Sequence, residues 1–476
     1  MAKRKQKIAL KTRKTSAAAR NKAAGQSHQV GPLKQNWPIL PADRTSLSMA
    51  IFSQMQFIER MPPEQQNRQQ LRQVERVLRF ARETVPFYRE SLDEIRRIPD
   101  GEMDEAFLSG LPILTRSEIQ SAGLELRSTR TPPEHGPVFL QRTSGSTGKP
   151  IEVATTRLRA VMSNAHTLRT HYWHRLDVSQ KSVEIRTAYK PGAEPKKPVW
   201  SVLPWAGPSK RLDINLPISE LFDQFIDEDP SSVLSHPYTL MLLAERSRET
   251  GIQPKNLSTA RSFAETLTPN IRQTLREIWN VPVIDSYSAT EIGIIAHQCP
   301  DNENLHVQVE NVRIEVLDDN GNQCKPGMSG KVVITPLQNF ASPLVRYEIG
   351  DYAEVGESCS CGRTLPVLTR ILGRHRNLCV LKNGERFFPE IQADLKPFGH
   401  IRQFQAHQKS LEDIDLKIVA ERTFTREEKN EVEAIVQKKF HYPFRVNIIE
   451  VDDIPRAANG KFEEFKSDIP EAKMDD

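Results

Sequence analysis

The sequence predicts an α/β fold with two parts: a large domain built on mostly parallel sheets, and a small mobile α/β lid at the C-terminal end. Strand and helix patterns alternate between residues 182 and 284, as they do in βαβ units whose strands run parallel. A second strand–helix–strand pattern covers residues 414–451. The chain has 476 residues, which is enough for several domains with separate cores.

The composition is that of a globular protein. Apolar residues make up 38% of the chain and charged residues 27%, both within the usual range. No apolar run approaches the ~18 residues of a membrane-spanning helix, and the basic N-terminus lacks the apolar core of a signal peptide. The five cysteines, an odd number in a chain this long, do not indicate a disulfide framework. We therefore expect a cytoplasmic protein.

The positive charge of the chain is concentrated at its start. The net charge is +5, but residues 1–25 hold nine lysines and arginines and no acidic residue, so the remainder is mildly acidic. A Pro- and Gly-containing linker follows over residues 26–44. The tail is typical of a disordered, solubilising extension, and the same charge can bind nucleic acid or an anionic surface.

Apolar periodicity predicts the elements that surround the candidate motifs. Helices are expected over 46–60 and 64–85, where apolar residues recur at intervals of three and four and Pro86 ends the second helix. Further helices are predicted at 156–172, within 232–250, at 268–279 and at 426–440, and strands at 182–188, 199–204, 260–265, 281–284, 309–317, 330–336, 414–420 and 444–451.

A loop rich in glycine and hydroxyl residues indicates phosphate binding. Backbone N–H groups freed by glycine, hydroxyl donors and one lysine together suit a polyphosphate. The loop is not a Walker A motif, because Pro150 follows the lysine and the next residues alternate like a strand. We expect a flap between two strands, although a flexible Gly/Ser turn would give a similar pattern. The candidate phosphate-binding residues are Thr143, Ser144, Gly145, Ser146, Thr147, Gly148 and Lys149.

Two further segments combine nucleotide-binding residue types with positions at strand ends. Residues 285–291, Asp-Ser-Tyr-Ser-Ala-Thr-Glu, directly follow a predicted strand, and ligands bind beyond the ends of parallel strands. The tyrosine can stack on a purine and the glutamate can hold Mg²⁺, but a polar helix start would look the same. Asp351 can accept ribose hydroxyls, although Gly-Asp is also a common turn.

A cluster of cysteines and histidines predicts a structural zinc site. Three thiols and one imidazole, from Cys299, His306, Cys359 and Cys361, are a closed tetrahedral ligand set. His306 is favoured over His297 because its spacing from Cys299 allows the loop to turn back. The alternative is that these are small, partly buried thiols with no metal.

Five segments, taken together, resemble the ordered motifs of the adenylate-forming superfamily. They are the loop at 141–153, the segment 285–291, Arg346 to Asp351, Gly373-Arg374, and Ile454 to Lys461. Residues 85–89, Val-Pro-Phe-Tyr-Arg, and 111–115, Leu-Pro-Ile-Leu-Thr, resemble the N-terminal region of phenylacetate-CoA ligases and their capsule-associated relatives. The resemblance covers about residues 45–476.

The resemblance implies a division of the chain and a role for each motif. It implies a large domain over 45–372, a hinge at 373–377 and a mobile lid over 378–476, after the basic tail and linker of 1–44. It also implies that Tyr287 lies against adenine, Thr290 on the phosphate side, Glu291 on Mg²⁺, Asp351 on ribose, Arg374 on ribose or phosphate, and that Lys461 enters the active site. The neighbouring residues alone give a different interpretation: a lysine after Asn-Gly is typical of an exposed turn.

The implied activity is the ATP-dependent activation of a carboxylic acid. An acyl-adenylate forms with release of pyrophosphate, and the acyl group then passes to CoA. The alternatives are a different acceptor, such as an amine, a carrier protein or a hydroxyl, and a catalytically silent nucleotide-binding or scaffold relative. Ser288, where the family has glycine, and the Arg376-Asn377 pair after the hinge arginine depart from the pattern. Some relatives bind zinc at cysteines arranged like those here.

Overall fold

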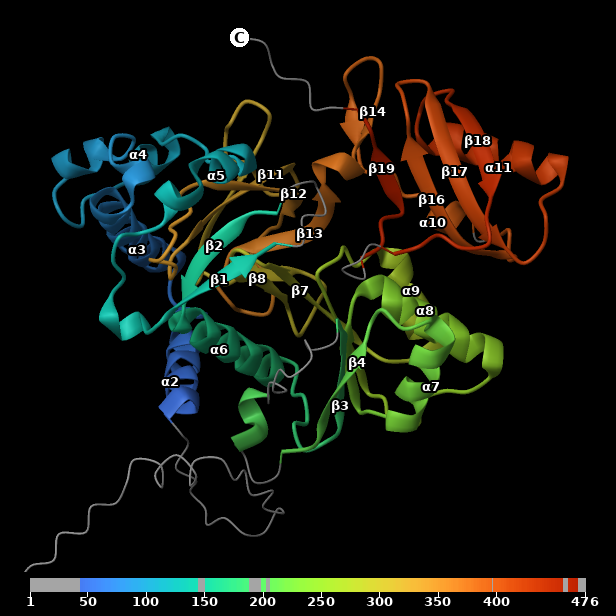
Figure 1. Ribbon diagram of the computed structural model, residues 1–476, viewed down its shortest axis with the longest axis horizontal. Helices are drawn as coiled ribbons and strands as arrows, with labels where there is room; N and C mark the ends of the chain where they lie inside the picture. Colours follow the sequence, from blue (N-terminus) through green and yellow to red (C-terminus); the bar gives the residue numbers. More distant parts are fainter. Residues whose placement is uncertain are drawn as a thin grey trace, which may run out of the picture.

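The structure is a computed structural model that describes residues 43–143, 150–187, 198–202, 206–395, 397–456 and 461–469. Figure 1 shows a group of N-terminal helices, a long central sheet with helices on both sides, and a smaller C-terminal unit beside the sheet. The basic tail and most of the glycine-rich loop, Ser144 to Lys149, lie outside the described residues. Among the described helices, none is long and apolar enough to cross a membrane.

Two long N-terminal helices confirm the predicted periodicity. They are α2 (Asp43–Ile58) and α3 (Pro63–Thr84), and Val74, Leu78 and Ala81 bury one face of α3 completely. Two short helices follow, α4 (Glu105–Gly110) and α5 (Arg116–Ala122), with the 3-10 turns η1 (Pro86–Tyr88), η2 (Asp93–Arg97), η3 (Gly123–Leu126) and η4 (Pro133–His135) around them.

These N-terminal helices are bound to strands far along the chain. Gln70 Nε2 donates to the carbonyl oxygens of Val309 and Val312 at 2.7 and 2.8 Å. The backbone N–H of Leu114, just before α5, donates to Arg346 O at 2.9 Å. Each bond joins residues more than 200 positions apart. The helices therefore complete the central body and are not an independent unit.

The central sheet has eleven strands in the order β10-β11-β12-β13-β9-β8-β7-β6-β5-β3-β4. In its parallel half, neighbouring strands run in the same direction. The strands here are β3 (Ser182–Arg186), β4 (Ser209–Asp213), β5 (Ser232–Ser235), β6 (Thr259–Phe263) and β7 (Val283–Ala289). The α/β fold with a parallel sheet is thus confirmed in the segment where strand and helix patterns alternate.

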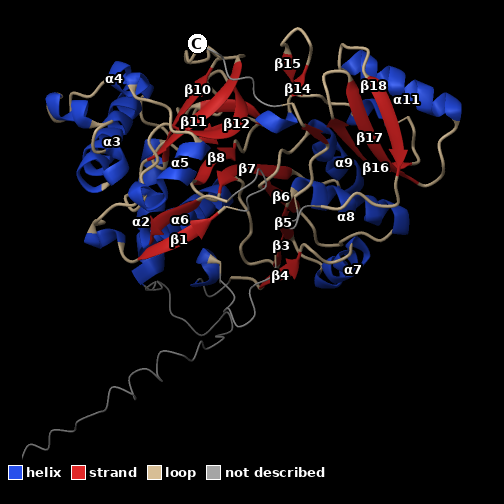
Figure 2. Ribbon diagram, turned by 45° about the horizontal axis from the view of Figure 1, so that its top comes forward, coloured by secondary structure: helices blue, strands red, loops and turns tan. Residues whose placement is uncertain are grey.

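Helices cover one face of the parallel half. On this face lie α7 (Ile218–Glu228), α8 (Pro237–Thr250) and α9 (Pro269–Trp279), and α6 (Arg157–Trp173) packs against β8 in the adjoining part of the sheet (Figures 1 and 2). The face under α7, α8 and α9 holds a core of fully buried residues such as Ile185, Phe225, Val233 and Leu243. This arrangement leaves the carboxyl ends of the parallel strands open at one edge of the layers.

Beyond β7 the same sheet continues with antiparallel strands. These are β8 (Gly293–Gln298), β9 (Leu305–Val307), β10 (Val312–Leu317), β11 (Ser329–Pro336), β12 (Tyr347–Val355) and β13 (Val367–Arg374). One predicted strand is wrong: residues 199–202 form the 3-10 turn η5 (Val199–Val202). Ser201 N donates to Pro198 O at 3.0 Å, which closes a turn where an extended strand was expected.

A two-stranded hairpin flanks the glycine-rich loop. Strands β1 (Val138–Arg142) and β2 (Glu152–Thr156) pair antiparallel, with Arg142 opposite Glu152. The prediction that this loop joins two strands is therefore confirmed.

The C-terminal unit has its own sheet and core. Strands β16 (Ile401–Gln408), β17 (Asp413–Ala420), β18 (Arg445–Glu450) and β19 (Phe465–Ser467) pair in the order β18-β17-β16-β19, and α11 (Arg426–Lys439) packs on them. The hairpin β14 (Cys379–Val380) and β15 (Arg386–Phe387), the short α10 (Gln392–Leu395) and the turn η6 (His375–Asn377) complete the unit. Its core includes Leu416, Val436, Phe440 and Phe444, all fully buried.

The C-terminal unit docks on the body through several contacts, of which those of Ile454 and Phe462 are buried. Ile454 and Phe462 join the core formed by α7, α8 and α9. The ring of Phe462 stacks on Tyr238 with centroids 4.0 Å apart, and Phe462 N donates to Glu265 Oε1 at 2.8 Å. This contact fixes the position of the neighbouring Lys461 against the body.

Candidate active site

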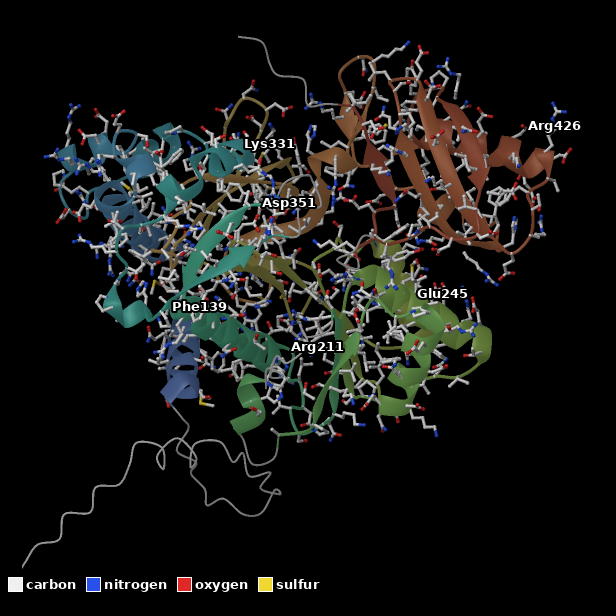
Figure 3. The ribbon with its side chains drawn as sticks, viewed as in Figure 1. Phe139, Arg211, Glu245, Lys331, Asp351 and Arg426 are labelled. Atoms are coloured by element: carbon white, nitrogen blue, oxygen red, sulfur yellow. The ribbon has the colours of Figure 1, made fainter. Side chains whose placement is uncertain are left out.

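The centre of the candidate site is a carboxylate held by two donors. Tyr287 Oη donates to Asp351 Oδ2 at 2.7 Å, and Arg374 Nε lies 3.2 Å from Asp351 Oδ1. Arg374 stands opposite Asp351 in the β12–β13 ladder, whereas Tyr287 lies on β7, which β9 and β8 separate from β13 in the sheet order. Figure 3 shows Asp351 between the central sheet and the C-terminal unit.

Charge in this centre is concentrated and shielded from water. Burial raises the pKa of Tyr287 well above its usual value, and Asp351 adds to the effect, so the phenol remains a donor. Burial alone would lower the pKa of Arg374, but Asp351 and Glu291 together hold it above its usual value. The arginine therefore stays charged at any pH the protein meets.

Glu291 lies beside a small cavity next to this centre. Its side chain is buried, with the residue 5% exposed, and Tyr347 Oη donates to its Oε1 at 3.3 Å. The cavity has a volume of ≈ 20 Å³, about what one water molecule or ion needs. Glu291 is the one carboxylate among its lining residues, which include Thr155, Arg159 and Asn311. One carboxylate combined with substrate phosphates is a common way for proteins to bind Mg²⁺, so the residues present fit that ion.

Lys461 reaches the same centre from the C-terminal unit. Burial lowers the pKa of Lys461, and the charge of Arg374 adds to this effect. Glu265 and Asp351 act in the opposite direction. The next residue, Phe462, donates its N–H to Glu265 Oε1 at 2.8 Å, so the segment that carries Lys461 contacts the body at Glu265.

The remaining predicted residues lie at different distances from this centre. Thr290 is exposed in the turn between β7 and β8, and no contact joins it to the others among the described residues. Thr143 closes the base of the glycine-rich loop, because its N–H donates to Ile151 O and its Oγ1 accepts from Ile151 N, both at 3.0 Å. Of the seven residues predicted in that loop, Ser144 to Lys149 lie outside the described residues.

Sequence reasoning gave no role to Glu265, which connects the site to the C-terminal unit. Its carboxylate accepts from Phe462 N at 2.8 Å and from Tyr238 N at 3.3 Å, and lies 3.4 Å from His236 Nδ1. The preceding Ala264 has a φ of 72°, a conformation that favours glycine. The available signal was the position of Glu265 at the carboxyl end of a predicted parallel strand.

The four predicted zinc ligands come together. One ligand atom from each of Cys299, His306, Cys359 and Cys361 lies within 4.8 Å of the other three. The Cys299 and Cys359 Sγ atoms are 3.7 Å apart, close to the ~3.8 Å edge of a tetrahedron with zinc–sulfur bonds of about 2.3 Å. His297 is not in this group and instead contacts Ser286 Oγ through Nδ1 at 3.0 Å. The donor set fits a structural zinc ion.

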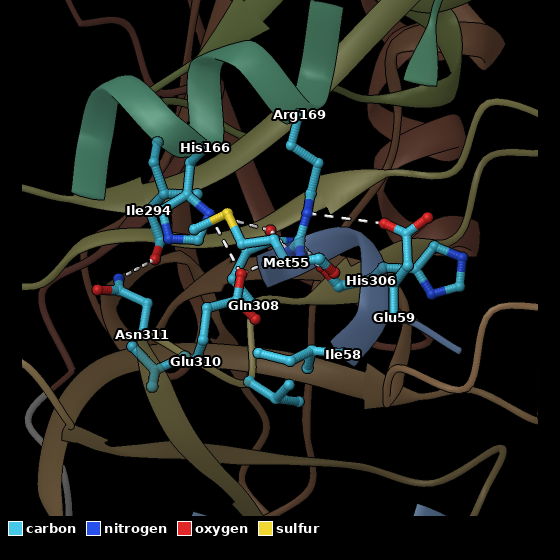
Figure 4. Close-up of polar contacts among 12 residues, drawn as sticks. Met55, Ile58, Glu59, His166, Arg169, Ile294, His306, Gln308, Glu310 and Asn311 are labelled. Atoms are coloured by element: carbon cyan, nitrogen blue, oxygen red, sulfur yellow. Dashed lines mark hydrogen bonds and ion pairs between the residues drawn. The ribbon is translucent and has the colours of Figure 1, made fainter. Parts of the chain in front are cut away.

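A buried polar network supports the strand that carries His306. Arg169 on α6 donates to Gln308 Oε1 at 2.6 Å and to Glu310 Oε1 at 2.5 Å, both just after β9. Figure 4 shows these contacts from the helix to the strand end, with Glu59 and His306 beside them. Because Arg169 has no exposed surface, these bonds compensate the cost of burying its charge.

Comparisons with known proteins find similarity to a domain family, to named enzymes and to solved structures. Residues 390–468 match the CapK C-terminal domain. The phenylacetate-coenzyme A ligase of Thermus thermophilus is 25% identical, over 79% of this chain and 86% of that protein. The ligase of the same name from Escherichia coli is 21% identical, over 75% and 83%.

A solved structure shares the fold of both parts. The 2-hydroxyisobutyryl-CoA ligase in its postadenylation state superposes with a TM-score of 0.70 at 19% identity, over 92% of this chain and 95% of that one. The same enzyme in its thioesterification state gives 0.56 over the same shares. The two parts of this chain are therefore arranged more like the former. The chain is thus similar in sequence to phenylacetate-CoA ligases and to the CapK C-terminal domain, and it shares the fold of a CoA ligase.

Proposed function

We propose that this chain uses ATP to activate a carboxylic acid as an acyl-adenylate, with release of pyrophosphate, and then transfers the acyl group to CoA. The observation that carries the proposal is that the segment carrying Lys461 docks on the body at Glu265, where Phe462 N donates to Glu265 Oε1 at 2.8 Å, while the pKa of Lys461 responds to the charges of Asp351 and Arg374. The relatives support it, since both curated relatives are phenylacetate-CoA ligases and the solved neighbour is a CoA ligase.

The proposed nucleotide site uses the residues around Asp351. Asp351 accepts the ribose hydroxyls, Tyr287 lies against the adenine, and Arg374 lies beside the ribose or phosphates. The loop from Thr143 to Lys149 covers the phosphates, to which its backbone N–H groups and hydroxyls donate.

The chemistry of the first step follows from charge. When the acid carboxylate attacks the α-phosphate, negative charge grows on the phosphate oxygens, and Lys461 compensates it. Mg²⁺ held by Glu291, with Thr290 on the phosphate side, supplies further positive charge at these oxygens.

The second step requires movement of the C-terminal unit, which we propose acts as a lid. The large domain spans 45–372, the hinge 373–377 and the lid 378–476. Two hinge residues bond the segment that carries Lys461: Arg376 Nε donates to Glu463 Oε1 at 2.8 Å, and Asn377 Nδ2 donates to Phe465 O at 2.7 Å. A rotation at the hinge therefore withdraws the lysine and lets a thiol approach the adenylate.

The test is acid-dependent exchange of pyrophosphate into ATP, which reports the first step alone, across a panel of aryl, fatty and hydroxy acids. Lys461→Ala should lower the exchange rate by about 10²–10³-fold, the scale of removing one preorganised donor. Lys466→Ala, on the same segment, is the matched control and should keep the rate.

The full reaction identifies the acceptor. With CoA present, a CoA thioester and AMP should accumulate at equal rates. AMP release that is indifferent to CoA would reject CoA in favour of an amine, hydroxyl or carrier protein. Absence of both ATP binding and exchange would reject the enzymatic function.

We further propose that the cluster of Cys299, His306, Cys359 and Cys361 holds one structural zinc ion, because the donor set is complete and compact. Thiolate ligands of this kind persist in a reducing compartment, so the cytoplasm is the proposed location.

A further inference from the structure

Three arginines lie on one face of the parallel half of the sheet, opposite to α7, α8 and α9. Arg211 on β4 stands opposite Glu184 on β3, and Arg261 on β6 stands opposite Leu234 in the same row across the sheet. Arg186 lies two residues after Glu184, so it points to the same face. The alternate residues, such as Ile185 and Leu212, fill the core under the helices.

Arg261 is buried, and its Nε has no hydrogen-bond acceptor among the described residues. The residue is 7% exposed. Burial lowers the pKa of Arg261 to about 10; Glu184 opposes this shift and Arg186 adds to it. A buried guanidinium without a bound anion is costly, so this position requires an explanation.

A carboxylate on this face interacts with all three arginines. Glu184 Oε2 accepts from Arg211 at 2.9 Å and lies 3.7 Å from Arg186 Nε, and Asp213 stands opposite Arg186 in the ladder. Burial would raise the pKa of Glu184, but the three arginines together hold it below its usual value. Arg186, Arg211 and Arg261 therefore form one charged group around Glu184.

A line of contacts joins the arginines to the candidate active site. The guanidinium carbon of Arg186 lies 4.0 Å from the ring centroid of Phe263, and this ring meets that of His236 edge-on at 5.0 Å. His236 lies 3.4 Å from Glu265, which bonds the residue next to Lys461. These residues follow the carboxyl ends of parallel strands, where such sheets bind ligands. In Figure 3, Asp351 and Arg211 mark the two ends of this region.

We propose that the acid substrate carries a second anionic group, a carboxylate or sulfonate, which Arg186, Arg211 and Arg261 bind. The reacting carboxylate lies at Lys461, and the body of the acid lies along His236 and Phe263. The inference rests on the proposed function, and it narrows the substrate class from carboxylic acids in general to acids with a remote second negative charge.

The test compares acids that differ only in that charge. Pyrophosphate exchange is measured without CoA for phenylacetate against 4-carboxyphenylacetate, and for hexanoate against adipate. The wild type should use the dianionic member of at least one pair with the higher kcat/KM. Arg186→Gln should lower that value by about 10–100-fold, the effect of losing a hydrogen bond to a charged group, without a matching loss for the monoanionic acid.

Two variants keep the test interpretable. Arg186 has a side chain that is 38% exposed, so Arg186→Gln should fold normally, and Arg261→Met should give the same loss if it folds. Arg248→Met is the control: this side chain is 63% exposed and pairs with Glu245 on α8, away from the cluster.

Each of the remaining outcomes either overturns the inference of a second anionic group or separates it from the proposed ligase function. Equal use of both members of each pair, unchanged in Arg186→Gln, overturns the inference. An effect of Arg186→Gln on the KM for CoA in the full reaction, with none on exchange, also overturns it and assigns the arginines to the phosphates of CoA. If no acid supports exchange, calorimetry with 4-carboxyphenylacetate and adipate separates the two proposals: binding that Arg186→Gln abolishes upholds the anion site and rejects the ligase function, and no binding rejects both.

Discussion

Asp351 illustrates how a single carboxylate can be oriented before its ligand arrives. Its two oxygens take one partner each, from Tyr287 and Arg374, and a carboxylate has about four acceptor positions. Acceptor positions therefore remain for two ribose hydroxyls. Because both partners come from strands of the rigid sheet, the geometry does not depend on the nucleotide, which limits the ordering cost of binding.

Asp351→Asn should weaken nucleotide binding more than it slows the chemical step. The amide keeps the shape but loses the negative charge that Arg374 and the ribose hydroxyls require. We expect the KM for ATP in the exchange reaction to rise by about 10–100-fold, the scale of a hydrogen bond to a charged group. Asp319→Asn, on an exposed turn between β10 and β11, is the control, and an unchanged KM in Asp351→Asn would remove this residue from the nucleotide site.

At the scale of elements, the cysteine cluster connects parts of the sheet that have few hydrogen bonds of their own. Cys299 directly follows β8, His306 lies on β9, and Cys359 and Cys361 lie between β12 and β13. The ladder from β9 to β13 has two residue pairs. A metal bound to all four residues would therefore hold the β8–β9 turn to the β12–β13 connection.

Cys299→Ser should release the metal and destabilise this region. Elemental analysis of the purified protein should find about one zinc per wild-type chain and none in the variant, with a lower melting temperature, because a structural zinc contributes directly to folding. Cys324→Ser changes a cysteine outside the cluster and should retain the metal. A wild-type chain without zinc, purified without chelators, would contradict the proposal.

At the scale of the whole molecule, the docking of the C-terminal unit involves a carboxyl group with an unusual pKa. Burial raises the pKa of Glu464 to about 7, and the charges of Glu390 and Glu265 add to the rise. Glu390 and Glu464 come from the C-terminal unit and Glu265 from the body. Three acidic groups therefore converge where the two parts meet, and the docked arrangement favours the protonated form of Glu464.

Raising the pH should weaken the docked arrangement. A carboxyl whose pKa is raised on folding contributes stability fully below its unfolded pKa, near 4.5, and loses it as the pH rises to about 7. Glu464→Gln mimics the protonated form. Its free energy of unfolding should exceed that of the wild type by an amount that grows between pH 5 and pH 8, to at most about 3 kcal/mol. The difference in melting temperature between the two proteins should grow over the same range. A constant difference over this range would show that Glu464 does not titrate there.

The parallel half of the sheet was predictable because βαβ units alternate strand and helix periodicities in the sequence. Strand β4 and helix α7 were missed, and residues 199–202 were wrongly expected to form a strand. The continuation of the same sheet through six antiparallel strands could not be foreseen, because period-2 patterns predict a strand but not its partner. Pairings such as β9 with β13 join segments that are distant in sequence.

For the site, the motifs predicted that Tyr287, Asp351 and Arg374 act together, and the structure shows them in contact. Glu265 could not be given a role from the sequence, because its partner Phe462 reaches it only where the C-terminal unit docks. The sequence could not predict that the three arginines lie together, for a similar reason. Arg186, Arg211 and Arg261 lie on three separate strands, and only their register brings them together.

The long-range bonds of the N-terminal helices have a consequence for synthesis of the chain on the ribosome. Gln70 needs the carbonyl groups of Val309 and Val312, and Leu114 needs that of Arg346. At translation rates of about 5–20 residues per second, these partners emerge on the order of ten seconds or more after the helices that need them. Until then α3 and its neighbours expose their apolar faces, so we expect these helices to gain their full stability only after residue 346 has been synthesised, and the nascent chain to be prone to aggregation before that.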